Sequence, residues 1–112
     1  MTAIEEMLAS LVDRFNRHAA RNPATAEELR GLDRTIVVRL TDEGTYAVDL
    51  HDGQLKNLRT GGAPRADVTI TTDQTTFRGL LAKEIGPMKA LVTRKLAIDG
   101  SLEDKLLFRR LL

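Results

Sequence analysis

The chain has few side chains of the types that carry out covalent or metal chemistry. Its two histidines, His18 and His51, lie far apart in the sequence, and it contains no cysteine. A metal-binding pair on a helix needs two histidines about four residues apart. We therefore expect a structural or surface role for both histidines. The absence of cysteine excludes disulfides, thiolate zinc sites and a cysteine nucleophile.

Four acidic residues lie close together in the first half of the chain: Asp42, Glu43, Asp49 and Asp52. Neighbouring carboxylates can bind a cation or act as an acid–base pair. Their spacing does not match a calcium-binding loop, however, and acidic residues are common in hairpin turns. We expect these four residues to be solvated in turns and on a strand face.

Gly61 and Gly62, followed by Arg65, form the only glycine pair in the sequence. Consecutive backbone N–H groups in such a segment can hold an anion. The segment lacks the lysine and hydroxyl residue of a phosphate loop and does not open a helix, so we interpret it as a flexible turn. With no G-x-S-x-G motif either, the sequence predicts no catalytic residue and no metal site, and we expect no enzyme.

Composition limits the class of protein further. The chain has 112 residues, of which 42% are hydrophobic and 29% charged, and its formal net charge is +1. Nucleic-acid-binding domains normally carry a strong basic excess, so we expect no nucleic-acid partner. No secretory leader is visible, and no apolar run approaches the roughly 20 residues of a membrane helix. We expect a single domain over residues 1–112, located in the cytoplasm.

Periodicity in the first half predicts helices followed by strands. Residues from Thr2, in a capping box with Glu5, to Pro23 show helical spacing, and a second capping signature at Thr25 precedes a short helix stopped by Gly31. Alternating apolar residues then predict strands over residues 34–41, 45–51 and 54–60. Asp52-Gly53 predicts a tight hairpin between the last two. In the third strand Leu55 and Leu58 do not share a face, which indicates a bulge or an edge position.

The second half predicts a strand, two helices, a strand and a last helix. Val68 and Ile70 mark the strand, and Asp73 then caps a helix that continues to Gly86 with Phe77, Leu80, Leu81 and Ile85 on one stripe. Pro87 begins the next helix, and Ser101 caps the last one. The fold class is α+β: a five-stranded, mostly antiparallel sheet with helices packed on one face, in the order α-β-β-β-β-α-α-β-α.

Two sequences in the second half resemble the sterol carrier protein family of sterol-transfer and non-specific lipid-transfer domains. These are ADVTITTD, residues Ala66 to Asp73, and RKLAIDG, residues Arg94 to Gly100, with the helices between them. The resemblance implies a lipid cavity between sheet and helices, with the last helix as an adjustable lid. It also implies binding and transfer of sterols, fatty acids, acyl-CoA or phospholipids without a cofactor. Arg94 stands where the family often has glycine, and Leu91 where an aromatic residue is common.

We therefore expect a lipid-binding and lipid-transfer protein that holds a sterol, fatty acid, fatty acyl-CoA or isoprenoid in an apolar cavity. The alternative is a non-catalytic accessory subunit that docks an enzyme of lipid metabolism, or forms a homodimer, through its apolar C-terminal helix. Residues 78–112 carry a local charge of +4, which also favours transient contact with an anionic membrane surface. The residues expected to line the cavity are Phe77, Leu81, Ile85, Met88, Leu91, Val92, Leu106 and Leu107, above a sheet floor of Val38, Val48 and Ile70.

Overall fold

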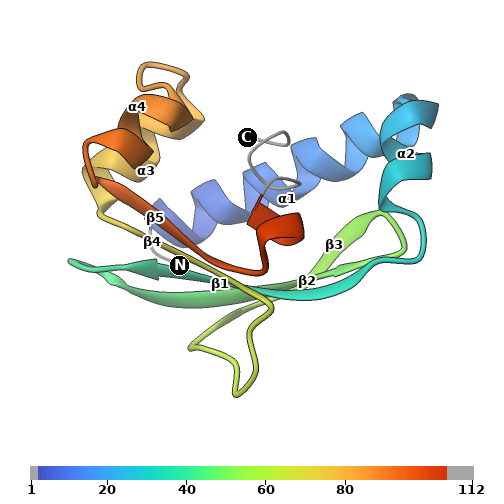
Figure 1. Ribbon diagram of the computed structural model, residues 1–112, viewed down its shortest axis with the longest axis horizontal. Helices are drawn as coiled ribbons and strands as arrows, with labels where there is room; N and C mark the ends of the chain where they lie inside the picture. Colours follow the sequence, from blue (N-terminus) through green and yellow to red (C-terminus); the bar gives the residue numbers. More distant parts are fainter. Residues whose placement is uncertain (1–2, 106–112) are drawn as a thin grey trace.

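A five-stranded sheet runs through the computed structural model, which describes residues 3–105 (Figure 1). The strand order is β3-β2-β1-β4-β5, and every neighbouring pair is antiparallel except β1 and β4. The predicted fold class is confirmed: the sheet is mostly antiparallel and the helices lie on one side of it. The strands are β1 (Asp33–Leu40), β2 (Gly44–His51), β3 (Gln54–Thr60), β4 (Val68–Thr72) and β5 (Leu96–Gly100).

The parallel pairing of β1 with β4 follows from the path of residues 61–67. This loop leaves the edge strand β3, passes on the side of the sheet away from the helices, and enters β4 next to β1 (Figure 1). Val37 lies in β1 on that same outer face, opposite Ala47 and Thr69, and it is buried. A central strand shields its side chains with both neighbours, so the small apolar area formed by Val37 and Ala47 is accommodated on a mostly polar face.

The predicted hairpin turn between β2 and β3 and the predicted bulge in β3 are both present. Asp52 and Gly53 both have positive φ, 51° and 83°, as a two-residue hairpin of the primed type requires. In β3 the register slips by one residue between the pairs formed by Ala47 and Asp49, and Asn57 there has φ 61°. The extra residue turns Leu55 and Leu58 to the same face, and β3 is also an edge strand.

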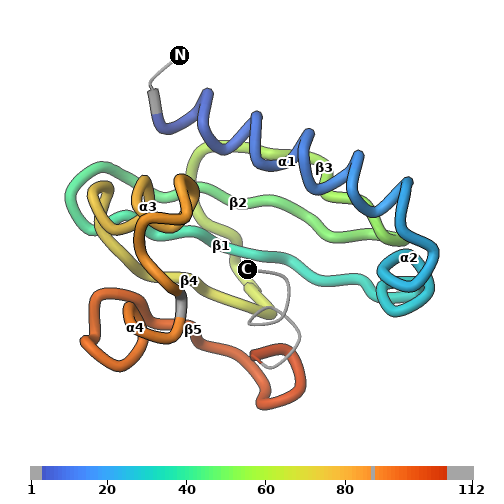
Figure 2. Tube along the Cα trace, turned by 90° about the horizontal axis from the view of Figure 1, so that it is seen from above, coloured from blue at the N-terminus to red at the C-terminus, as the bar shows by residue number. Residues whose placement is uncertain are grey.

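Helices cover one face of the sheet and leave the other to solvent (Figure 1; Figure 2). Residues 102–105 begin a further helix after β5, and the N–H of Asp104 donates to Ser101 Oγ at 3.1 Å, which confirms the predicted cap. Among the described residues, no helix combines the length and apolar character needed to cross a bilayer. The complete helices are α1 (Ala3–Arg21), α2 (Pro23–Leu29), α3 (Gln74–Leu81) and α4 (Pro87–Val92).

Two details of the helices differ from the sequence expectation. The cap of α2 is Asn22, whose side chain accepts from the N–H of Thr25, so Thr25 lies inside the helix and does not begin it. The helix capped by Asp73 ends at Leu81 and does not reach Gly86. The reason is local: Lys83 has φ 60°, so the chain reverses there and the N–H of Ile85 donates to Gly79 O at 3.1 Å.

Buried apolar side chains form two groups between the sheet and the helices. The first core cluster contains Leu29, Ile36, Val48, Leu50, Val68, Ala90, Leu96 and Ile98. The second core cluster contains Ile4, Leu8, Val38, Leu40, Tyr46 and Phe77. α2, α4 and β5 contribute to the first cluster, and α1 and α3 to the second, so the sheet is the floor common to both.

Candidate functional site

The three sheet residues expected in the cavity floor point to the helical side. Val38 and Ile70 are directly paired across β1 and β4, and Val48 pairs with Ile36. Val38 and Val48 are buried, whereas Ile70 is half-buried. These positions make a continuous apolar surface beneath the helices, as a ligand floor needs.

The helix residues expected above that floor divide between the two core clusters. Phe77 is buried in the second cluster beside Val38, and Leu81 packs against the same group. Ile85 and Leu91 are half-buried and pack against the first cluster. Leu106 and Leu107 lie outside the described residues.

Met88 and Val92 do not lie in the core. Their side chains are 49% and 75% exposed, on the outward side of α4, whereas Ala90 of the same helix is 1% exposed. Two hollows among the described residues are likewise not lined by any residue of the predicted set. The other described side chains of that set pack into the two core clusters or against them.

One of these hollows is basic and lies along α1. It is lined by Arg14, Arg17, His18, Arg21 and Asn22. The basic residues follow a spacing of three, four and seven positions from Arg14, so they share one side of the helix. Arg17 is paired with Asp13 at 3.0 Å, and Arg14, His18 and Arg21 are exposed. The spacing of this row is visible in the sequence, although none of its residues was among the predicted site residues.

Asn16 determines which way the basic row faces. Its side-chain amide donates to Leu55 O at 2.9 Å, and its oxygen accepts from Leu55 N at 2.7 Å, which ties α1 to the edge strand β3. Arg14 is two residues away, or about 200° around the helix, so it lies on the flank away from β3. Phe15 and Leu11 pack toward the core clusters. The basic row therefore borders the apolar face of α1.

Such a row suits an anionic group at the end of an apolar chain. Arginine presents its N–H donors in a fork that matches a carboxylate, phosphate or sulfate, and two or three arginines can share one anion. The apolar face beside the row offers contact for the rest of the molecule. The arrangement can hold an amphiphile by its head group.

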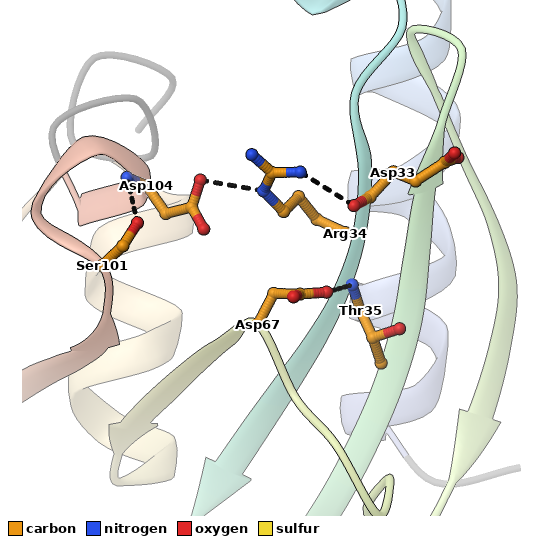
Figure 3. A network of polar contacts seen from close by, with 6 residues as sticks. All are labelled: Asp33, Arg34, Thr35, Asp67, Ser101 and Asp104. Atoms are coloured by element: carbon orange, nitrogen blue, oxygen red, sulfur yellow. Dashed lines mark hydrogen bonds and ion pairs between the residues drawn. The ribbon is translucent and has the colours of Figure 1, made fainter.

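The second hollow has mixed charge and lies at the ends of β1 and β2. It includes Arg34, Lys56, Asp67 and the pair formed by His51 and Asp33. In Figure 3, Arg34 Nε donates to Asp104 Oδ1 at 2.9 Å, and Asp67 accepts from the N–H of Thr35. The Asp104 partner raises the pKa of Arg34, and these contacts fasten the start of the last helix to β1.

Three of the four acidic residues singled out in the sequence have structural partners. Asp42 accepts from the N–H of Gln74, Glu43 accepts from the hydroxyl of Tyr46, and Asp49 is paired with Arg59. Within the described part of the chain, no group of three or more histidines and carboxylates is placed to hold a metal ion.

Comparison with known proteins gives one family and one fold. The model of the SCP-2 sterol transfer family matches residues 13–112. Sterol carrier protein 2 like 2 from Aedes aegypti is 15% identical and has a TM-score of 0.65, with 98% of this chain and 100% of that chain covered. The ubiquinone synthesis protein UbiJ-SCP2 is also 15% identical, with a TM-score of 0.66 and 96% and 95% covered. These two likenesses concern the fold.

A third similar structure is much larger. The stereoselective inverting sec-alkylsulfatase Pisa1 from Pseudomonas sp. is 26% identical, with a TM-score of 0.62 over 78% of this chain. This chain corresponds to only 14% of the sulfatase chain, so the likeness concerns one part of that enzyme. No curated protein matches the chain.

Proposed function

Because this chain belongs to the SCP-2 sterol transfer family, we propose that it carries a lipid made of an acyl chain and an acidic head group. The fold is that of a lipid-binding domain, and the family match is the first support. Within the ligand classes expected from the sequence, a fatty acid or a fatty acyl-CoA fits best. A sterol or an isoprenoid alcohol has no anionic group for the arginines of α1.

The basic hollow is the observation that carries this choice. Arg14 and Arg21 are exposed on the same flank of α1 as His18, next to the apolar face that packs on the sheet. A carboxylate held by an arginine makes charge-assisted hydrogen bonds, which are about twice as strong as neutral ones. The acyl chain would extend from there between α1, α3 and the sheet.

For the acyl chain of the ligand we propose the pocket expected from the sequence, without the exposed Met88 and Val92. Phe77 and Leu81 of α3 would contact one part of the ligand, and Ile85 and Leu91 another, above Val38, Val48 and Ile70. These side chains pack into the two core clusters when no ligand is bound, and we propose that the helices move outward when a lipid enters. The expected contribution of Leu106 and Leu107 to the pocket stays a prediction.

Binding of two ligands that differ only in the head group tests the proposal. In Arg14→Gln/Arg21→Gln, we expect palmitic acid to bind about 10–100 times more weakly, because hydrogen bonds to a charged group contribute about 1.5–3 kcal/mol. Hexadecanol, which has no charge, should bind the variant and the parent equally. Isothermal titration of both ligands gives the comparison.

Arg39→Gln is the matched control, because Arg39 is exposed on the outer face of the sheet. This variant should bind both ligands as the parent does. If palmitic acid binds Arg14→Gln/Arg21→Gln as tightly as the parent, the basic row does not hold the head group. If the parent binds neither ligand, the carrier function is wrong.

The second candidate is a non-catalytic accessory module. The sec-alkylsulfatase contains a similar part as 14% of its chain, so this fold occurs within an enzyme. In that case the present chain docks an enzyme of lipid metabolism or a second copy of itself, through the last helix, whose Leu102 is 74% exposed. Native mass spectrometry distinguishes the two. Co-purified lipid favours the carrier, and a lipid-free homodimer favours the module.

We propose no catalytic role in either case, and the expected cytoplasmic location and single-domain organisation stay predictions. Contact with an anionic membrane belongs to the carrier proposal, because a carrier must meet the membrane that supplies its lipid. The local charge of residues 78–112 supports it.

A further inference from the structure

The outward side of α4 exposes two large apolar side chains. Met88 and Val92 are four residues apart, hence on the same side of the helix, and they are 49% and 75% exposed. On the opposite side Ala90 is buried, and on the flank between the two sides Leu91 packs against the first core cluster. α4 therefore has one apolar side in the core and a second one in solvent.

Cationic residues lie before, within and after α4 in the sequence. Lys83, Lys89, Arg94 and Lys95 are all exposed, and Glu84 is the single acid between residues 83 and 95. The segment has a net charge of +3 in a chain of net charge +1, so the rest of the chain carries −2. Lys95 faces Asp73, but within the described residues Lys83, Lys89 and Arg94 form no ion pair.

The backbone at two of these cations is unusual. Lys83 and Arg94 have φ 60° and 62°, and each directly follows the C-cap residue of its helix, Ala82 in α3 and Thr93 in α4. Glycine is the common residue at that position because side chains disfavour the left-handed conformation. A cation there gains a small interaction with the helix dipole, which is weak for a helix as short as α4. Both positions therefore combine a disfavoured backbone conformation with an exposed positive charge.

We propose that this surface, defined as Met88 and Val92 with Lys83, Lys89 and Arg94, docks onto an anionic lipid bilayer. The cations contact lipid phosphates, and the two apolar side chains enter the interface between head groups and acyl chains. Three of the four cations in the segment are lysines, which protein–protein interfaces tend to exclude. A bilayer therefore fits the surface better than an acidic protein does.

The docking surface specifies where the proposed carrier would meet a membrane. Its link to lipid entry rests on the proposed function. Ile85 and Leu91, proposed ligand contacts, belong to the same segment as Met88 and Val92. Docking through the outward side of α4 would bring the bilayer next to the helix that must move when lipid enters.

Co-sedimentation with vesicles tests the surface. The probe is a vesicle of phosphatidylcholine with phosphatidylglycerol, compared with phosphatidylcholine alone. We expect the parent to bind only the anionic vesicle, and Arg94→Gly to bind it about fivefold more weakly, since each cation near such a surface contributes about that factor. Arg94→Lys should restore binding. Arg65→Gly removes the same charge from the loop on the other side of the sheet and should bind as the parent does (Figure 1).

Glycine suits the backbone at position 94, so the thermal midpoint of Arg94→Gly should equal or exceed that of the parent, which separates lost docking from lost folding. Palmitic acid binding in solution should be unchanged in this variant. If Arg94→Gly and Arg65→Gly weaken vesicle binding equally, or if the parent binds neither vesicle, the docking surface is wrong. If the parent binds anionic vesicles through Arg94 but no palmitic acid, docking stands and the carrier function fails.

Discussion

Gly79 is the residue at which α3 and the turn after it touch. A Cβ added there would lie 2.7 Å from Ile85 Cγ1, closer than side chains tolerate. Alanine normally stabilises a helix relative to glycine by up to about 1 kcal/mol. In Gly79→Ala we expect a net loss of about 1–2 kcal/mol, because displacing Ile85 from the core outweighs that gain. Urea unfolding measures the difference.

Two further variants show whether Ile85 is the cause. Gly44→Ala should be nearly neutral, since nothing lies within 4 Å of a Cβ there. Ile85→Val shortens the side chain that the added methyl group would meet, so the double variant Gly79→Ala/Ile85→Val should lose less than the sum of the single losses. A Gly79→Ala protein more stable than the parent would show that the turn moves freely.

Single residues also show which contacts could be predicted from the sequence and which could not. The hairpin at Asp52-Gly53 could be predicted because its signal lies in two adjacent residues. Asn16 could not, because its partner Leu55 is 39 residues away and any polar residue on a helix gives the same pattern. The basic row from Arg14 to Arg21 could have been recognised by spacing, but its relation to the sheet depends on Asn16.

α3 is the element whose stability should depend on pH. Asp73 caps it, accepting from Thr76 N at 2.7 Å and from Thr76 Oγ1 at 3.0 Å, and these hydrogen bonds, with Lys95 nearby, lower the pKa of Asp73 below its ordinary 3.8. A carboxylate with a lowered pKa stabilises the folded state above its unfolded pKa and loses that contribution as pH falls through the folded value.

The negative charge of Asp73 should therefore stabilise the folded state at neutral pH and not in acid. Asp73→Asn keeps an acceptor oxygen for Thr76, so we expect it to be less stable than the parent by about 0.3–1 kcal/mol at pH 7. The difference should shrink once pH falls below about 4. Asp73→Ala, which loses the cap itself, should cost about 1 kcal/mol and remain destabilised in acid. Urea unfolding of the parent and both variants at pH 7 and below about pH 4 measures these differences. If Asp73→Asn lowers the free energy of unfolding equally at both pH values, the electrostatic account is contradicted.

Helices and strands were predicted correctly where the signal lies in neighbouring residues. They were predicted less well where the structure depends on distant parts of the chain. Alternation of Ile36, Val38 and Leu40 defines β1 without outside information. The predicted end of α3 at Gly86 was wrong because Ile85 continues the apolar stripe of the helix in the sequence. The chain reverses at Lys83, and this reversal places Ile85 outside the helix. The parallel pairing of β1 and β4 depends on how residues 61–67 cross the sheet, which no local pattern specifies.

On the scale of the whole molecule, an open apolar pocket conflicts with stability. An apolar void costs about 24 cal/mol per Å³, so one of about 300 Å³ would cost roughly 7 kcal/mol. Domains are stable by only about 5–15 kcal/mol. The described side chains avoid this cost by packing into two clusters on one sheet. The proposed pocket is then a space that the ligand opens.

A ligand that opens the pocket must also stabilise the folded protein. Palmitic acid at about 100 times its dissociation constant should add about 2.7 kcal/mol. For a chain of this length that corresponds to a rise in the thermal midpoint of roughly 10 °C. Differential scanning calorimetry with increasing palmitic acid measures it, and octanoic acid, with too short a chain to span both clusters, should give a smaller rise at equal concentration. A midpoint that does not move at saturating palmitic acid would mean that the two clusters do not separate around a lipid. In Arg14→Gln/Arg21→Gln the same rise should require about 10–100 times more palmitic acid, because the chain contacts persist while the head-group contacts are lost.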